Sequence, residues 1–180
     1  MRALQLPPSY PEPEGVEKRA AVAIVAGPDE HLLFIRRADR EGDPWSGHMA
    51  FPGGRVDPAD ASVRAAAERE TMEEVGLDLR DAAFVGALTP LRSPLRTPTV
   101  DFAVFPFVWR VAAWPAFAPS DEVAAIHTFA LARIRAGEGR GTFRYRGYGF
   151  DTDLPCLDLD GQRIWGMTLR MLDDLLGRLG

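Results

Sequence analysis

Short apolar segments separated by turn residues recur along most of the chain and predict a β-rich fold. β-Branched and aromatic residues predict strands over 20–26 and 31–37, joined by a turn at 27–30. A short strand over 49–51 runs into the turn Pro52-Gly53-Gly54. Further strands are expected over 83–88, 100–111, 124–131, 143–150 and 154–159, and a hairpin turn is expected at 160–161.

Two segments have the period of an amphipathic helix. The first begins near Asp60 or Ser62, either of which can cap it, and ends at Gly76. The second, over 168–179, places its leucines on or near one face. Short helical turns are expected over 132–136, and 38–47, 92–98 and 115–121 read as loops. The fold class is therefore α+β, an α/β/α sandwich with a mixed sheet between helices.

Composition favours one domain of 180 residues, with a Pro-rich arm over 1–17 and the domain over 18–180. The net charge of −5 gives no support for binding nucleic acid. The single cysteine, Cys156, excludes an internal disulfide and fits a reducing compartment. No apolar run reaches the roughly 18 residues of a membrane span, and no signal-peptide pattern precedes the domain. We therefore expect a cytoplasmic protein without a membrane partner.

The first helix carries a cluster of acidic residues that needs an explanation. Glu70 and Glu74 lie about 40° apart on a helical wheel, and Glu73 lies about 60° to the other side of Glu70. Glu70 and Glu74 continue a face that begins with Val63 and buried-type alanines, so they turn inward. A bound Mg²⁺ or Mn²⁺ would relieve their repulsion, and Arg69 can hold one glutamate through a bidentate pair. The alternative is an ordinary exposed acidic face.

The segment over 54–77 resembles the signature of the Nudix hydrolases. The second half of that signature matches at every functional position, namely at Arg69, Glu70, Glu73, Glu74, Gly76 and Leu77. Thr71 stands where an aliphatic residue is usual, and Ala61 stands at the position of the first signature glutamate. Asp57 and Asp60 lie nearby, in a one-residue expansion that resembles the coenzyme A diphosphatase branch of the family.

This resemblance implies a Nudix fold and hydrolysis of a diphosphate linked to another moiety, with two or more Mg²⁺ or Mn²⁺ ions. It implies that Glu70 and Glu74 bind metal, that Glu73 does so directly or through water, and that the Gly54 carbonyl adds a ligand. Arg69 is expected to orient a glutamate. These assignments make Glu70, Glu73, Glu74 and Arg69 the catalytic cluster.

Three residues outside the signature are candidates for the same site. Glu122 is a candidate general base or extra metal ligand, and its alternative is a solvated loop acid. Arg36 and Arg37 end a strand near the site and are expected to bind the phosphates. Since alternate side chains face opposite sides of a strand, only one can face inward, and we favour Arg36.

The resemblance leaves the substrate open between coenzyme A or an acyl derivative and other nucleotides. The others are nucleotide sugars, ADP-ribose, dinucleotides and nucleoside triphosphates. The segment over 34–48 departs from the coenzyme A pattern, for example at Phe34, Arg37 and Glu41. Within it, His48 either contacts a phosphate or is structural, and Trp45 either stacks on a base or packs.

A non-catalytic nucleotide-sensing module is the rival class. Such modules lose signature glutamates, whereas this chain keeps Glu70, Glu73 and Glu74. A homodimer, through the N-terminal arm, is a further expectation left open.

Overall fold

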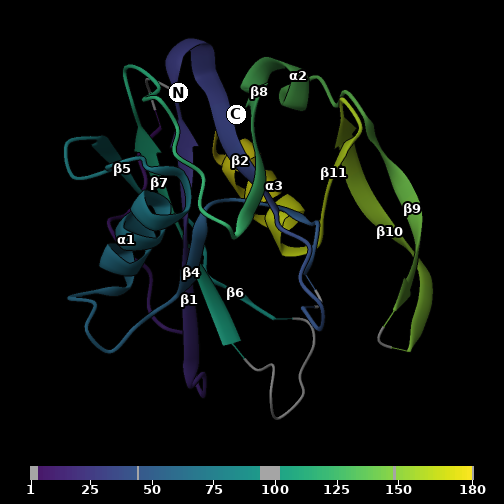
Figure 1. The fold of residues 1–180 in the computed structure, drawn as a ribbon, viewed down its shortest axis with the longest axis horizontal. Helices are drawn as coiled ribbons and strands as arrows, with labels where there is room; N and C mark the ends of the chain where they lie inside the picture. Colours follow the sequence, from purple (N-terminus) through teal and green to yellow (C-terminus); the bar gives the residue numbers. More distant parts are fainter. Residues whose placement is uncertain (1–3, 44, 94–101, 148, 180) are drawn as a thin grey trace.

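A mixed β-sheet forms the centre of the molecule in the computed structural model, which describes residues 4–43, 45–93, 102–147 and 149–179 (Figure 1). Its strands are β1 (Lys18–Ala26), β2 (His31–Arg37), β3 (Met49–Ala50), β4 (Gly53–Arg55), β5 (Ala83–Ala87), β6 (Leu91–Arg92), β7 (Phe102–Arg110) and β8 (Val123–Ala130). The helices are α1 (Val63–Val75), α2 (Leu131–Arg135) and α3 (Gly166–Leu179), with a 3₁₀ turn at Pro28–Glu30.

The strand pairing places the glycine turn in the middle of the sheet. β1 pairs in parallel with β7 along its whole length, from Lys18–Phe102 to Ala26–Arg110, and all other pairs are antiparallel. β2 pairs fully with β8 but meets β1 only at Ala26–Leu32. Away from this contact β1 and β2 separate, and the short strands β3 and β4 fill the space between them. β3 pairs with β2, and β4 pairs with β1. The turn at 51–53 therefore lies inside the sheet rather than at its rim.

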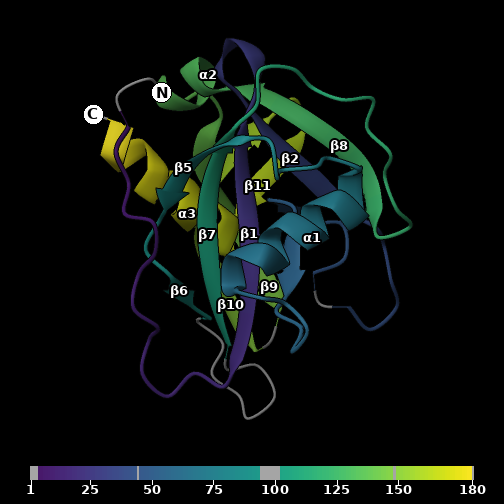
Figure 2. The same cartoon turned by 90° about the vertical axis from the view of Figure 1, so that its left-hand side faces the viewer.

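The two faces of the sheet carry separate cores, which confirms the predicted sandwich. Leu33 and Ile35 of β2 pack in the cluster that includes Ala66 and Ala67 of α1. The alternate residues Leu32 and Phe34 pack in the cluster that includes the leucines of α3. α1 covers one face and α3 the other, as the turned view shows (Figure 2). The helix predicted over 168–179 is present and begins two residues earlier.

A second sheet was not part of the predicted architecture. β9 (Arg140–Gly147), β10 (Phe150–Leu159) and β11 (Gln162–Trp165) form an antiparallel sheet at the right of Figure 1. The predicted boundaries at 143–150 and 154–159 are wrong because the turn falls at Gly149, where φ is +77°. Pro155 does not end β10, because it pairs only with β9, and pairing with β11 begins at Cys156.

Residues 4–17 of the N-terminal arm pack on the rest of the chain and contain no helix or strand. The carbonyl of Pro7 accepts a hydrogen bond from the Ala87 N–H at 2.7 Å. The Tyr10 hydroxyl accepts one from Arg178 of α3, also at 2.7 Å. The arm thus contacts the end of β5 and reaches α3. Its boundary at residue 17 and any role in a dimer stay predictions. In the part of the chain that the structure describes, no helix is long and apolar enough to cross a membrane.

Candidate metal and diphosphate site

Local signals fix the position of α1 and hence of its glutamates. Ser62 caps the helix by accepting a hydrogen bond from the Ala65 N–H at 3.0 Å. Gly76 ends it in the left-handed conformation, with φ of 71°, and its N–H donates to the Met72 carbonyl. Thr71 is fully buried, and its hydroxyl donates to the Ala67 carbonyl at 2.7 Å, so a polar residue is tolerated at a usually aliphatic position.

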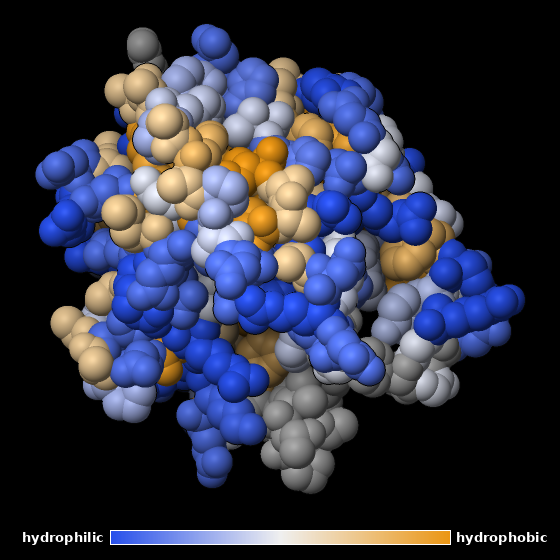
Figure 3. Space-filling model, in the orientation of Figure 1, coloured by the Kyte–Doolittle hydropathy of each residue, from blue (hydrophilic) through white to orange (hydrophobic). Residues whose placement is uncertain are grey.

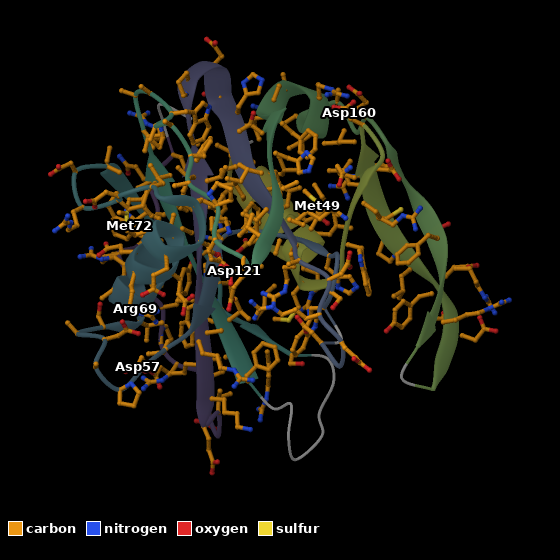
Figure 4. The ribbon with its side chains drawn as sticks, viewed as in Figure 1. Met49, Asp57, Arg69, Met72, Asp121 and Asp160 are labelled. Atoms are coloured by element: carbon orange, nitrogen blue, oxygen red, sulfur yellow. The ribbon has the colours of Figure 1, made fainter. Side chains whose placement is uncertain are left out.

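Arg69 binds three carboxylates at once. It forms a bidentate pair with Asp60 at 2.9 and 3.1 Å, and it donates to Glu70 at 3.0 Å and Glu73 at 2.9 Å. The hydrogen bond from Arg69 lowers the pKa of Asp60. Arg69 also donates to the Arg55 carbonyl at 3.2 Å, which ties the helix to the strand carrying the glycine pair. Arg69 lies at α1 in Figure 4, and its role in orienting a glutamate stays a prediction with which these hydrogen bonds are consistent.

Asp60 is a site residue that sequence reasoning noted without assigning a role. Its side chain is only 6% exposed, and both of its oxygens contact Arg69. Its 2.8 Å bond from the Asp57 N–H completes the turn ahead of α1. The sequence feature that pointed to Asp60 was its place in the one-residue expansion of the signature, near the position where the first signature glutamate is absent.

Glu74 is the buried carboxylate of the cluster. The residue is 3% exposed, and one oxygen accepts a 2.8 Å hydrogen bond from the Gly53 N–H. Burial is the largest cause that raises the pKa of Glu74, to about 7, and the charges of Glu70 and Glu122 also raise it. The hydrogen bond from Gly53 and the charge of Arg37 act in the opposite direction and offset only part of this rise. A carboxylate held at this energetic cost indicates a function that needs it.

The glycine pair brings the backbone against Glu70. A Cβ atom added at Gly54 would lie 2.5 Å from the carboxyl carbon of Glu70, so any other residue here would push this carboxylate from its position. Gly53 has φ of 148°, and a Cβ there would lie 2.2 Å from the Ala21 carbonyl. Burial also raises the pKa of Glu70, partly offset by Arg69. The space beside Gly54 is thus reserved for a carboxylate.

The donor set fits a hard divalent cation that completes its shell with other ligands. Among the residues that the structure describes, no three His, Cys, Asp or Glu side chains are arranged to enclose a metal ion by themselves. Mg²⁺ usually keeps several waters and takes only one or two carboxylates plus substrate phosphates. The carboxylates of Glu70 and Glu74 and the Gly54 carbonyl are such oxygen donors. Glu73 is far more open, with 57% of its side chain exposed.

The structure brings Glu122 to the same cluster from the start of β8. Its charge is among the causes that raise the pKa of both Glu70 and Glu74. The adjacent Asp121 lies between α1 and β8 in Figure 4. Glu122 forms an ion pair with Arg40 at 3.0 Å and is half exposed, so it is accessible to water. Hydrophilic side chains gather over α1 and the loops below it on this face of the molecule (Figure 3).

The preference for Arg36 on the glutamate face is wrong. Arg37 lies two residues after Ile35, which belongs to the core cluster that includes Ala66 and Ala67 of α1, and the charge of Arg37 lowers the pKa of Glu74. Arg36 lies two residues after Phe34, which packs in the cluster on the α3 face. The register of β2 against β8 shifts between Arg36 and Arg37, so the side of the sheet that each arginine takes depends on this irregularity and on long-range packing. Arg37 is therefore the arginine near the carboxylates.

Comparison with known proteins agrees with this geometry. A model of the NUDIX domain matches residues 16–146. The chain is 39% identical over 132 residues to an uncharacterized Nudix hydrolase, NudL, of Pectobacterium atrosepticum, covering 71% of this chain and 65% of that protein. It is 33% identical over 170 residues to NudL of Salmonella paratyphi B, and the match covers 91% of this chain and 84% of that protein.

A human relative carries a substrate in its name. The chain is 32% identical over 138 residues to the human mitochondrial coenzyme A diphosphatase NUDT8, covering 76% of this chain and 58% of that protein. Among solved structures, the NUDIX domain of Shewanella oneidensis NrtR, complexed with ADP ribose, superposes with a TM-score of 0.61 at 14% identity over 94% of both chains. At that identity the likeness shows the fold alone.

Proposed function

This chain belongs to the Nudix hydrolase family, and we propose that it is a Mg²⁺- or Mn²⁺-dependent hydrolase that cleaves the diphosphate of a nucleoside diphosphate linked to another moiety. The observation that supports this most is the burial of Glu74 and Glu70 against Gly53 and Gly54 with their pKa values raised. A structural role would favour neutral side chains there, whereas cation binding requires anionic oxygens.

Each residue of the cluster has a distinct task in this proposal. When bound, the divalent ions screen the phosphate charges and lower the pKa of bound water. Glu70 and Glu74 would hold the cation, and Arg69 fixes Glu70 and Glu73 in place. Glu122 accepts a proton from the attacking water, a role that suits a half-exposed carboxylate beside the cluster.

Arg37 is positioned to contact the phosphates on the glutamate face. One nitrogen pairs with Asp43 at 2.9 Å, while its Nε is buried without a hydrogen-bond partner among the described residues. Such an unsatisfied buried donor beside a carboxylate cluster would be satisfied by an anionic ligand such as a phosphate oxygen.

We propose coenzyme A or an acyl derivative as the first substrate to test. The support is the likeness to NUDT8 and the one-residue expansion that contains Asp57 and Asp60. Nucleotide sugars, ADP-ribose, dinucleotides and nucleoside triphosphates are the alternatives. A nucleotide-binding module without turnover is the outcome that a complete absence of hydrolysis would indicate.

The test is a hydrolysis panel over these compounds with Mg²⁺ or Mn²⁺, following phosphomonoester release. The proposal expects turnover of at least one diphosphate compound by the wild-type protein and by Glu68→Gln. Glu68 lies on the same helix but pairs with Arg64, outside the cluster. Glu74→Gln should lose on the order of 100-fold or more, since even partners that only orient metal ligands contribute 10- to 100-fold. Equal rates for both variants would refute the metal role of Glu74.

A further inference from the structure

A cavity of about 690 Å³ lies between the main sheet and the second sheet. One wall comes from β2, β3 and β8 and contains Arg36, Met49 and His127. The other wall comes from β9 and β11 and contains Tyr145 and Trp165. Small-molecule sites in proteins have volumes of about 300 to 1,000 Å³, so the cavity is large enough for a ligand of nucleotide size.

The main sheet separates this cavity from the carboxylate cluster. At Arg36, β2 pairs with Met49 of β3 on one side and with Ala125 of β8 on the other. All three of these residues line the cavity, whereas Glu74 belongs to α1, which covers the opposite face of the sheet. A ligand of the cavity is therefore bound apart from the proposed metal site.

Aromatic rings supply much of the wall that the second sheet forms. Trp165 has three ring neighbours, His48 at 4.8 Å, Tyr145 at 5.1 Å and Phe143 at 5.2 Å between centroids. All four residues line the cavity and are only partly buried, so ring surface is open to a ligand. Planar aromatic side chains stack favourably on a nucleobase, whichever base it is.

Arg36 brings a positive charge into the cavity without a carboxylate to balance it. The residue is partly buried, and its side chain has neither an ion pair nor a hydrogen bond within the described part of the chain. On the same wall, Nε2 of His127 is buried and has no hydrogen-bond partner among the described residues. The described residues that line the cavity include no Asp or Glu. A partly buried guanidinium needs a counter-charge, which an anionic ligand would supply.

The remaining charges around the cavity are already partly balanced. Burial lowers the pKa of His127 and the charge of Arg36 lowers it further, while Asp160 acts in the opposite direction. Arg163, on the opposite wall, stacks over the Phe143 ring at 4.7 Å and lies 3.8 Å from the carboxylate of Asp158. Arg36 is therefore the residue on which an anion gains most.

We propose that this cavity is a second ligand site, separate from the carboxylate cluster, and that it binds a nucleoside monophosphate. The base lies against Tyr145 and Trp165, and the phosphate lies on Arg36, whose guanidinium can donate two parallel hydrogen bonds to phosphate oxygens. The volume of the cavity leaves room for the ribose between them. No metal ion and no bond cleavage take part, so the site does not depend on the proposed diphosphatase function.

Isothermal titration in the presence of a metal chelator tests the site with three probes. Adenosine 5′-monophosphate carries both the ring and the phosphate, adenosine carries only the ring, and ribose 5-phosphate carries only the phosphate. Adenosine 5′-monophosphate should bind at least about tenfold more tightly than either fragment, because stacking and a charge-assisted hydrogen bond each contribute about that factor. Equal affinity for adenosine 5′-monophosphate and ribose 5-phosphate would overturn the proposal.

Two pairs of variants assign the contacts. Arg36→Ala should lower the affinity for adenosine 5′-monophosphate to that for adenosine, and Arg36→Lys should keep part of the difference. Tyr145→Ala should weaken adenosine and adenosine 5′-monophosphate by the same factor, and Tyr145→Phe, which keeps the ring, should bind both as the wild type does. Arg80→Ala, which removes an exposed arginine that pairs with Asp78, should leave all affinities unchanged. Wild-type affinities in folded Arg36→Ala and Tyr145→Ala proteins, with melting temperatures as the check of folding, would overturn the assignment.

Glu74→Gln distinguishes this site from the proposed metal site. The variant should bind adenosine 5′-monophosphate as the wild type does, with chelator or with Mn²⁺, because the sheet lies between the two sites. Binding that is lost in Glu74→Gln, or that requires Mn²⁺, would place the nucleotide at the carboxylate cluster and overturn the proposal. Absence of diphosphate turnover together with the expected affinities would instead overturn the proposed function and leave the cavity assignment standing.

Discussion

Replacing Glu74 with glutamine should make the metal-free protein more stable and inactive at the same time. The carboxyl of Glu74 is 3% exposed, and its pKa is raised from 4.5 to about 7. The folded protein therefore binds this proton more tightly than the unfolded chain does. Between these two pKa values the free energy of unfolding falls as pH rises, because the folded state then gives up a proton it prefers to keep.

The size of this effect follows from the shift itself. One pKa unit corresponds to about 1.4 kcal/mol, so the ionised Glu74 destabilises the metal-free fold by about 3 kcal/mol at about pH 8. Glutamine has nearly the same shape, carries no charge, and its carbonyl can still accept from the Gly53 N–H. Its amide nitrogen needs a new partner, so we expect a net gain of about 1 to 3 kcal/mol at about pH 8.

Urea unfolding of the chelator-treated proteins measures this directly. Glu74→Gln should unfold at higher urea than the wild type at about pH 8, and the difference should shrink toward about pH 5. Glu68→Gln, which loses a half-exposed pair with Arg64, should change stability by less than about 0.5 kcal/mol. A Glu74→Gln protein that is less stable at about pH 8, or equally stabilised at both pH values, would refute the reasoning.

Three further predictions concern the same cluster. Added Mg²⁺ should raise the melting temperature more at about pH 8 than at about pH 6, since Glu74 must lose its proton to bind metal, and equal shifts would contradict this. Gly54→Ala should lower kcat at least about tenfold, because the added Cβ meets the Glu70 carboxylate. Circular dichroism should show that the fold is retained, and an unchanged kcat would argue against that contact. Arg69→Ala should lose about 1 to 3 kcal/mol in urea unfolding, because Asp60 loses its partner, and an unchanged midpoint would refute it.

The helix and its boundaries could be predicted because they depend on local chemistry. Ser62, Gly76 and the period of the buried alanines act within a few residues of one another. The inward direction of Glu70 and Glu74 followed from the same period, and burial confirms it most clearly for Glu74.

The remaining features depend on contacts between distant segments. The face on which Arg37 lies is set by the pairing of β2 with β8, and Asp60 gains its role only when Arg69 reaches back to it. The second sheet and its cavity require β9 to β11 to stand opposite β2, which no local pattern in the sequence specifies.

Mn²⁺ titration followed by electron paramagnetic resonance tests the central claim most directly, that Glu70 and Glu74 hold a divalent cation beside the glycine pair. The account predicts that the wild-type protein and Glu68→Gln bind Mn²⁺ with the same affinity. It predicts that Glu70→Gln and Glu74→Gln lose that binding along with diphosphate turnover. Unchanged Mn²⁺ affinity in both of these variants would contradict the account.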